Sequence, residues 1–211
     1  MAQHSFALRR HAHDVAELHF LESLTEEVDP ADAARMVAEA SAANLPQGNK
    51  TAARFLADPV RSFAVTEARA GTIDGVWATF VRIGPKAGAG AESRAGRGSA
   101  SETTFAFAEL PRHVAWTEVW PRPQWVPVSP DLAVGDPEFD ARYMVACDDP
   151  DRTLTPPVVA RFLATPDETF SWASIWDDRV CAHGIHGPAG HADDERLVEF
   201  AVSLSAAMND Q

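Results

Sequence analysis

Cysteine and long apolar runs are scarce in this chain of 211 residues, and each scarcity excludes a class of protein. Its 2 cysteines cannot build the disulfide framework of a small secreted domain. No apolar stretch approaches the roughly 20 residues that a membrane-spanning helix needs, and the opening MAQHSFALRRHAHD has no apolar segment of the signal-peptide kind. We therefore expect a cytoplasmic protein without membrane insertion.

Positive charge is also in short supply. The chain carries 18 Lys and Arg against 31 Asp and Glu, a formal net charge of −13. Proteins that bind nucleic acid neutralise phosphates with clustered Lys and Arg, and anionic membranes attract the same residues. The charge balance therefore argues against nucleic acid and against an anionic membrane surface as partners.

Familiar catalytic signatures are missing too. The sequence holds no Gly-x-Ser-x-Gly elbow, no Walker phosphate loop and no kinase set. The run GAGAES at 88–93 is similar to a dinucleotide loop, but the residues after it, SRAGRGSASE, cannot form the helix that such a loop requires. No cofactor is expected from these motifs.

The chain does have enough hydrophobic residues, 45%, to form a core. These residues recur with the spacing of helices in the first part of the chain and with the alternation of strands after it. Val15, Leu18, Leu21 and Leu24 form one stripe of a first helix that fades at Glu26 and Glu27. A second helix is predicted from Asp29 as N-cap and Pro30 at its first position. The apolar stripe of the first helix either packs inside the chain or meets its own copy in a homodimer.

Short segments follow in which apolar and polar residues alternate, and this alternation is typical of strands. Strands are predicted around 63–67 and 77–84 with a turn at 70–75, and at 103–110 and 113–120, broken by Pro111. Gly, Ala and Ser dominate residues 86–102, which predicts a flexible loop. The proline-rich connector 121–137 is the candidate boundary inside an otherwise single domain, 1–211.

The last third of the chain alternates between strand and helix signals. A strand is predicted over 139–147, a helix after Thr155 with Pro156 at its start, a strand over 170–176 and a turn at Asp177 that begins a hairpin. A final helix opens at Asp193 and Asp194. Turns too short for parallel crossovers indicate an α+β fold with a largely antiparallel sheet, N-terminal helices, one central short helix and a C-terminal helix.

This last unit resembles a bacterial family of unknown function. The shared pattern is Phe-x-x-Arg-(Tyr/Phe)-x-Val, an Asp-Asp-Pro turn, a Leu-Thr-Pro helix start and a Trp before a hairpin. The matching residues are Phe139, Arg142, Tyr143, Val145, Asp148, Asp149, Pro150, Leu154, Thr155, Pro156 and Trp172. Relatives in that family are often membrane-anchored, and the matching residues are architectural, so the resemblance implies a fold and no reaction.

Tryptophans are the first candidate site. Trp116 and Trp120 share one face of a strand, and Trp172 and Trp176 repeat that spacing on a later strand. Trp125 lies beyond a bend in the proline-rich connector. Aromatic faces of this kind either fill a core or line a pocket or a partner surface, and the sequence leaves both readings open.

The second candidate is a group of potential metal ligands in the hairpin. Cys181, His183, His186 and His191 are residue types that Zn²⁺ favours. On a strand, however, residues 181 and 183 point to one side and 186 to the other. The alternatives are a zinc site and a solvated hairpin rich in histidine.

Two classes of function remain. Because catalytic motifs are missing, we favour a non-enzymatic accessory or protein-interaction module whose partner the sequence does not identify. The alternative is a small-molecule-binding or metal-dependent enzyme that uses the tryptophan face or the histidine hairpin.

Overall fold

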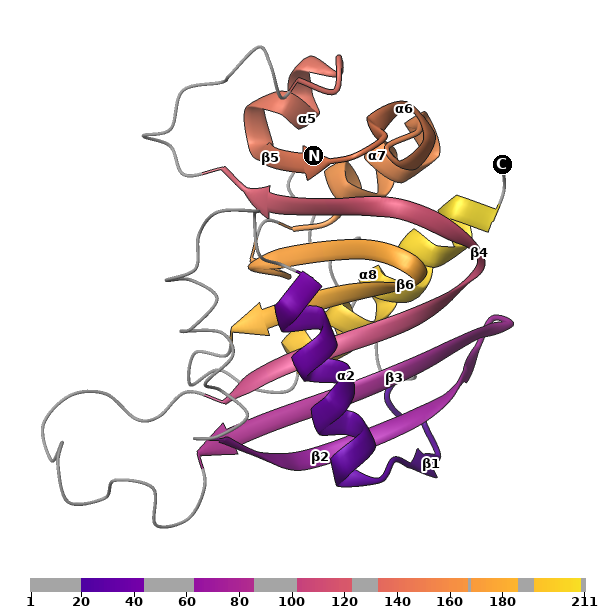
Figure 1. Cartoon of the computed structure of the whole chain (residues 1–211), viewed down its shortest axis with the longest axis vertical. Helices are drawn as coiled ribbons and strands as arrows, with labels where there is room; N and C mark the ends of the chain where they lie inside the picture. Colours follow the sequence, from indigo (N-terminus) through magenta and orange to yellow (C-terminus); the bar gives the residue numbers. More distant parts are fainter. Residues whose placement is uncertain are drawn as a thin grey trace, which may run out of the picture.

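A computed structural model describes residues 20–43, 63–85, 102–122, 133–166, 168–185 and 192–209. Five helices and six strands occur in these ranges, and the strands form one antiparallel sheet (Figure 1). The elements in chain order are β1 Glu26–Glu27, α2 Pro30–Ala43, β2 Phe63–Ile73, β3 Val76–Pro85, β4 Thr103–Pro121, α5 Pro137–Arg142, β5 Tyr143–Cys147, α6 Pro150–Thr153, α7 Pro156–Ala164, β6 Trp172–Ile185 and α8 Ala192–Asn209. The predicted α+β class with a C-terminal helix is confirmed.

The sheet runs β1-β2-β3-β4-β5, and β6 pairs with β4. A tight turn at Asp74 and Gly75, with φ values of 50° and 82°, joins β2 to β3. An Asp-Gly pair with positive φ at both residues is a favoured hairpin turn. The predicted hairpin is therefore present, with a first strand that runs on to Ile73.

Two of the strands bend back sharply (Figure 1). β4 spans both segments predicted on either side of Pro111, and its pairing with β6 shifts register between Glu109 and Val114. β6 reverses at Asp177, whose φ is 48°, and the Ser171 N–H donates to the His183 carbonyl across the two arms at 2.8 Å. The predicted turn at Asp177 is present, and the arms of β6 lie between the arms of β4.

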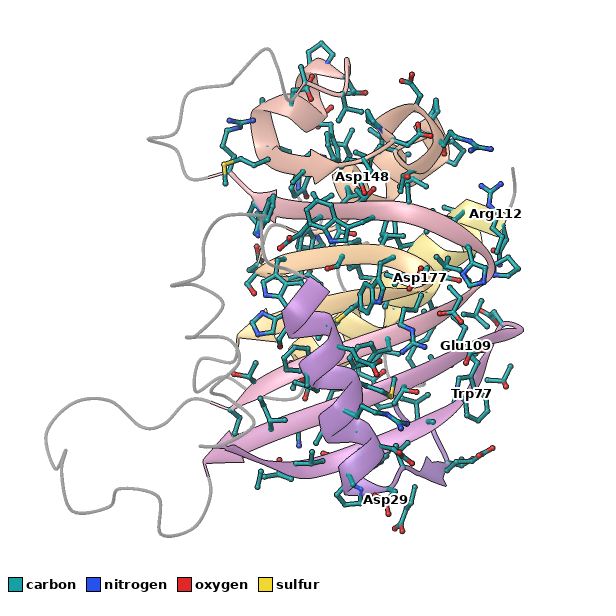
Figure 2. The ribbon with its side chains drawn as sticks, viewed as in Figure 1. Asp29, Trp77, Glu109, Arg112, Asp148 and Asp177 are labelled. Carbon is teal, nitrogen blue, oxygen red and sulfur yellow. The ribbon has the colours of Figure 1, made fainter. Side chains whose placement is uncertain are left out.

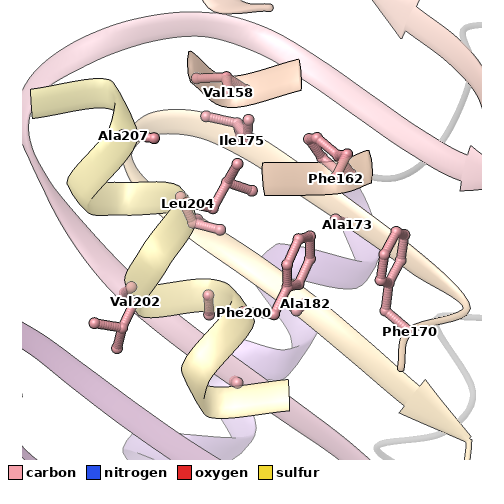
Figure 3. Close-up of a cluster of buried hydrophobic side chains, with 14 of the residues drawn as sticks. Val158, Phe162, Phe170, Ala173, Ile175, Ala182, Phe200, Val202, Leu204 and Ala207 are labelled. Carbon is pink, nitrogen blue, oxygen red and sulfur yellow. The ribbon is translucent and has the colours of Figure 1, made fainter. Parts of the chain in front are cut away.

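Helices cover both faces of this sheet. α2 lies on one face, here called the α2 face, and α8 crosses the other with α7 beside it (Figure 1). The α8 side buries the larger core, in which Phe162, Phe170 and Phe200 lie together with ring centroids 4.7–5.8 Å apart (Figure 3). Such aromatic contacts stabilise beyond the area that they bury.

The helix starts follow the predicted signals. Asp29 accepts a hydrogen bond from the Ala31 N–H at 2.7 Å and so caps α2, as predicted. α7 begins with Pro156 after Thr155, although the Thr155 side chain makes no capping hydrogen bond. α8 begins at Ala192.

Two local predictions are wrong. Residues 139–142 of the strand predicted over 139–147 belong instead to α5, and the strand begins at Tyr143. The helix forms because Asp136 accepts hydrogen bonds from the N–H groups of Glu138 and Phe139 and Pro137 occupies the first position. Residues 20–23 form a turn, and Glu26–Glu27 pair with β2. The earlier part of the predicted first helix lies outside the described residues, as do 86–101 of the predicted loop.

Leu24 from the predicted apolar stripe is buried in the core of the chain, and Leu21 packs against it. This agrees with packing inside the chain for these two leucines; a homodimer stays a prediction. In the described part of the chain, no helix combines the length and the apolar character needed to cross a membrane.

Candidate functional site on the α2 face

The α2 face carries the second apolar cluster of the molecule. Ala33, Val37 and Ala40 of α2 pack there onto side chains of three strands. The strand residues are Val81, Ile83, Phe105, Phe107, Trp172 and Cys181. Small residues at 33 and 40 let the helix approach the sheet closely, so this part of the face is a packed core.

The predicted tryptophans gather on the same face. Trp116 and Trp120 flank Glu118 on β4, while Trp172 and Trp176 flank Ser174 on β6. Glu118 is paired directly with Ser174. Because paired residues of antiparallel strands share a face, the two tryptophan pairs belong to one surface.

Burial divides these tryptophans into two roles. Trp172 is 9% exposed and belongs to the core under α2, whereas Trp116, Trp120 and Trp176 are half-buried. The structure therefore combines the two readings that the sequence left open. Trp125 lies outside the described residues.

Glu118 is the unusual group of this surface. It is 1% exposed, and burial raises the pKa of its carboxyl from 4.5 to about 8, while a hydrogen bond with Trp120 lowers it. Glu118 Oε2 and Trp116 Nε1 are both buried without a hydrogen-bond partner. At neutral pH Glu118 is therefore mostly an uncharged acid, able to donate as well as accept a hydrogen bond.

Cys181 and His183 lie on the α2 face, where they pair with Phe107 and Phe105 of β4, but their surroundings do not favour zinc. Cys181 is fully buried, and burial raises the pKa of its thiol, which disfavours the thiolate that binds metal. The His183 ring stacks on Trp172 at 4.8 Å, and its Nδ1 contacts the Ser171 hydroxyl. No group of three or more His, Cys, Asp or Glu in the described ranges could hold a metal ion, and His186 and His191 lie outside those ranges.

An open groove runs beside α2, away from the buried acid. It has a volume of about 450 Å³ and lies between the helix and the sheet. Trp77 and Phe107 contribute apolar surface from the strands, and Met36 contributes it from the helix. Figure 2 shows Trp77 and Glu109 on this side of the molecule, near the strand ends to the right of α2.

Charged residues line the same groove. Arg35, Glu39, Glu109 and Arg179 come from three different elements. Arg179 Nη1 lies 3.5 Å from Glu39 Oε2, so an ion pair joins β6 to α2. Aromatic, methionine and arginine side chains together are the composition enriched in protein interfaces.

Sequence reasoning missed the most informative residues here. Glu118 stands at the centre of WTEVW, an acid at an alternating position between two tryptophans, and that pattern is a readable signal for a buried carboxyl. Trp77 was recognised only as a strand residue. Its place in a groove depends on how α2 crosses the sheet, which no local pattern encodes.

Comparisons with known proteins add little to this geometry. No family model matches the chain, and no curated protein matches it. Among solved structures, the chain is similar to the crystal structure of the mycobacterial trehalose monomycolate transport factor A, TtfA. The TM-score is 0.44 and the identity 12%, over 74% of this chain and 76% of that chain. The resemblance of residues 139–172 to a bacterial family stays a prediction.

Proposed function

We propose that this protein is a non-enzymatic accessory protein that binds a segment of a partner protein in the groove beside α2. The observation that carries the proposal is an open groove of about 450 Å³ that is lined by both Trp77 of β3 and Met36 of α2. Both side chains are half-buried, so each retains apolar surface that a partner could cover.

The chemistry of the groove supports a polypeptide as the occupant. Tryptophan, methionine and arginine are enriched at protein interfaces, and tryptophan and arginine are among the residue types that contribute most to binding energy there. Arg35 and Arg179 offer donors, Glu39 and Glu109 offer acceptors, and backbone amides carry both kinds of group. The apolar floor would hold a side chain while the charged rim bonds the backbone.

Site-directed photo-crosslinking tests the proposal in cells that make the protein. A photoreactive phenylalanine derivative replaces Trp77 in one variant and Arg161, exposed on α7 on the other side of the sheet, in a control variant. We expect one protein to crosslink at position 77 and not at position 161.

Purified partner then gives the quantitative test. Trp77→Ala should raise its Kd by about 30-fold or more, the effect of an interface hot spot of roughly 2 kcal/mol. Arg161→Ala should leave the Kd unchanged. Equal crosslinking at both positions, or a Kd that Trp77→Ala leaves unchanged, would refute the proposal.

A further inference from the structure

A second groove lies away from the α2 face, where the bend of β4 meets α6. It has a volume of about 350 Å³. One wall is the β4 segment Arg112 to Ala115, and the other is formed by residues of the Asp-Asp-Pro turn, α6 and the start of α7. Figure 2 labels Arg112 at the bend and Asp148 on the segment that leads from β5 to α6. We call this site the α6 groove.

A buried hydroxyl in the α6 groove has no partner. Thr153 lines the groove and is 1% exposed, and its Oγ1 makes no hydrogen bond. An unsatisfied buried polar atom costs free energy, and native structures contain few of them. A ligand that reached this hydroxyl would supply the missing hydrogen bond.

The two walls differ in charge. Arg112 and His113 line the β4 wall, and the Arg112 guanidinium gives that wall a positive charge. Asp149, Asp151 and Arg152 line the α6 wall, which is net negative. The Asp149 side chain is half-buried and makes no capping hydrogen bond to α6. The groove thus has a positive and a negative side around one unsatisfied hydroxyl.

We propose that the α6 groove binds a short zwitterionic peptide. Its ammonium group would lie against Asp149 and Asp151, its carboxylate against Arg112, and one of its polar groups would bond to the Thr153 hydroxyl. A carboxylate suits the donors of an arginine, and an ammonium suits two carboxylates.

Net charge discriminates between ligand classes. The arginines and aspartates of the groove balance, with Arg112 and Arg152 against Asp149 and Asp151. The whole chain carries −13, which repels a ligand with several negative charges. A ligand with one charge of each sign presents a group of opposite charge to each wall and meets no such repulsion.

Three dipeptides of nearly equal size test this prediction by ¹⁵N–¹H NMR titration of the full chain. The probes are Ala-Ala, its N-acetyl derivative and its C-terminal amide. We expect saturable shifts of the Thr153 and Val114 amide signals with Ala-Ala in the millimolar range, and at least about tenfold weaker binding of each singly charged derivative.

Two variants then assign the site. Thr153→Val should weaken Ala-Ala binding by about tenfold while the melting temperature stays equal or rises, because the change removes an unpaired hydroxyl. The matched control is Thr169→Val, since Thr169 Oγ1 is also buried and unpartnered but does not line the groove. Asp149→Asn should reduce the preference for Ala-Ala over its N-acetyl derivative, because it leaves Asp151 as the one remaining carboxylate for the ammonium group.

Several outcomes would overturn the proposal. These are no saturable shift with Ala-Ala, equal binding of the N-acetyl derivative, or equal losses in Thr153→Val and Thr169→Val. If Thr153→Val failed to fold, Asp149→Asn would still decide the question, because it changes a side chain that makes no capping bond.

Discussion

Glutamine at position 118 should make the protein more stable in mild alkali and leave it nearly unchanged in mild acid. Glu118 is 1% exposed, and burial raises the pKa of its carboxyl to about 8. The folded chain therefore keeps a proton that the unfolded chain loses near pH 4.5. Glutamine has nearly the shape of the protonated acid and can still accept the hydrogen bond from Trp120.

The sign and size follow from proton linkage. Between about pH 4.5 and 8 the folded state binds more protons than the unfolded state, so the free energy of unfolding falls as the pH rises. Each pH unit costs about 1.36 kcal/mol in that window, which amounts to about 3 kcal/mol between pH 5 and pH 7.5. Glutamine does not titrate, so the free energy of unfolding of Glu118→Gln should not fall in this way between pH 5 and pH 7.5.

Urea unfolding of both proteins at pH 5, 6, 7 and 7.5 measures the difference. We expect the two free energies of unfolding to be similar at pH 5 and to separate by about 3 kcal/mol at pH 7.5, with the variant more stable. The control is Glu109→Gln, which changes an exposed acid on the same strand and should give a difference within about 0.5 kcal/mol at every pH. If the free energy of unfolding changed with pH by the same amount in wild type and in Glu118→Gln, the reasoning would be refuted.

Three other predictions concern the core and its thiols. Arg82→Met should destabilise the chain by about 3–5 kcal/mol in urea, because Arg82 lies 2.5 Å from the buried Asp194 carboxylate and the substitution removes that positive charge; a loss below about 1 kcal/mol would contradict this. Phe162→Ala should cost about 3–5 kcal/mol, since the ring is fully buried among four other aromatic rings, and calorimetry would show the fall in Tm. Ellman's reagent should leave buried Cys181 unmodified in the native protein and react with it only after unfolding; rapid reaction of both Cys147 and Cys181 in native buffer would disprove its burial.

Local signals predicted much of the fold. The cap at Asp29, the proline at the start of α7 and the Asp-Gly turn after β2 are short-range features, and the structure confirms each. The failure at 139–142 has a physical cause: Phe139 and Tyr143 fit both an alternating strand and one helical turn. Asp136 and Pro137 decide for the helix, because a capping aspartate followed by proline is a helix start signal that outweighs the alternation.

The candidate site was less predictable. Alternation placed Trp116 and Trp120 on one face, which the strand confirms, but it did not reveal that Glu118 lies buried between them. The two grooves form where elements distant in sequence meet, α2 over β3 in one and α6 beside the bend of β4 in the other. Contacts of that kind follow from topology, and a single sequence contains no direct signal for them.

The folded-back path of β4 and β6 imposes an order on assembly. The inner strand of the sheet comes from residues 172–185, whereas the two arms that enclose it are made much earlier, at 103–121. During synthesis, each arm of β4 therefore has one unpaired edge until β6 has been made and can pair with it. Unpaired edges are templates for wrong pairing, and distant pairings form slowly. A chain that stopped before residue 172 would leave the middle of its own sheet open, and we expect such a fragment to associate with itself or to need a chaperone.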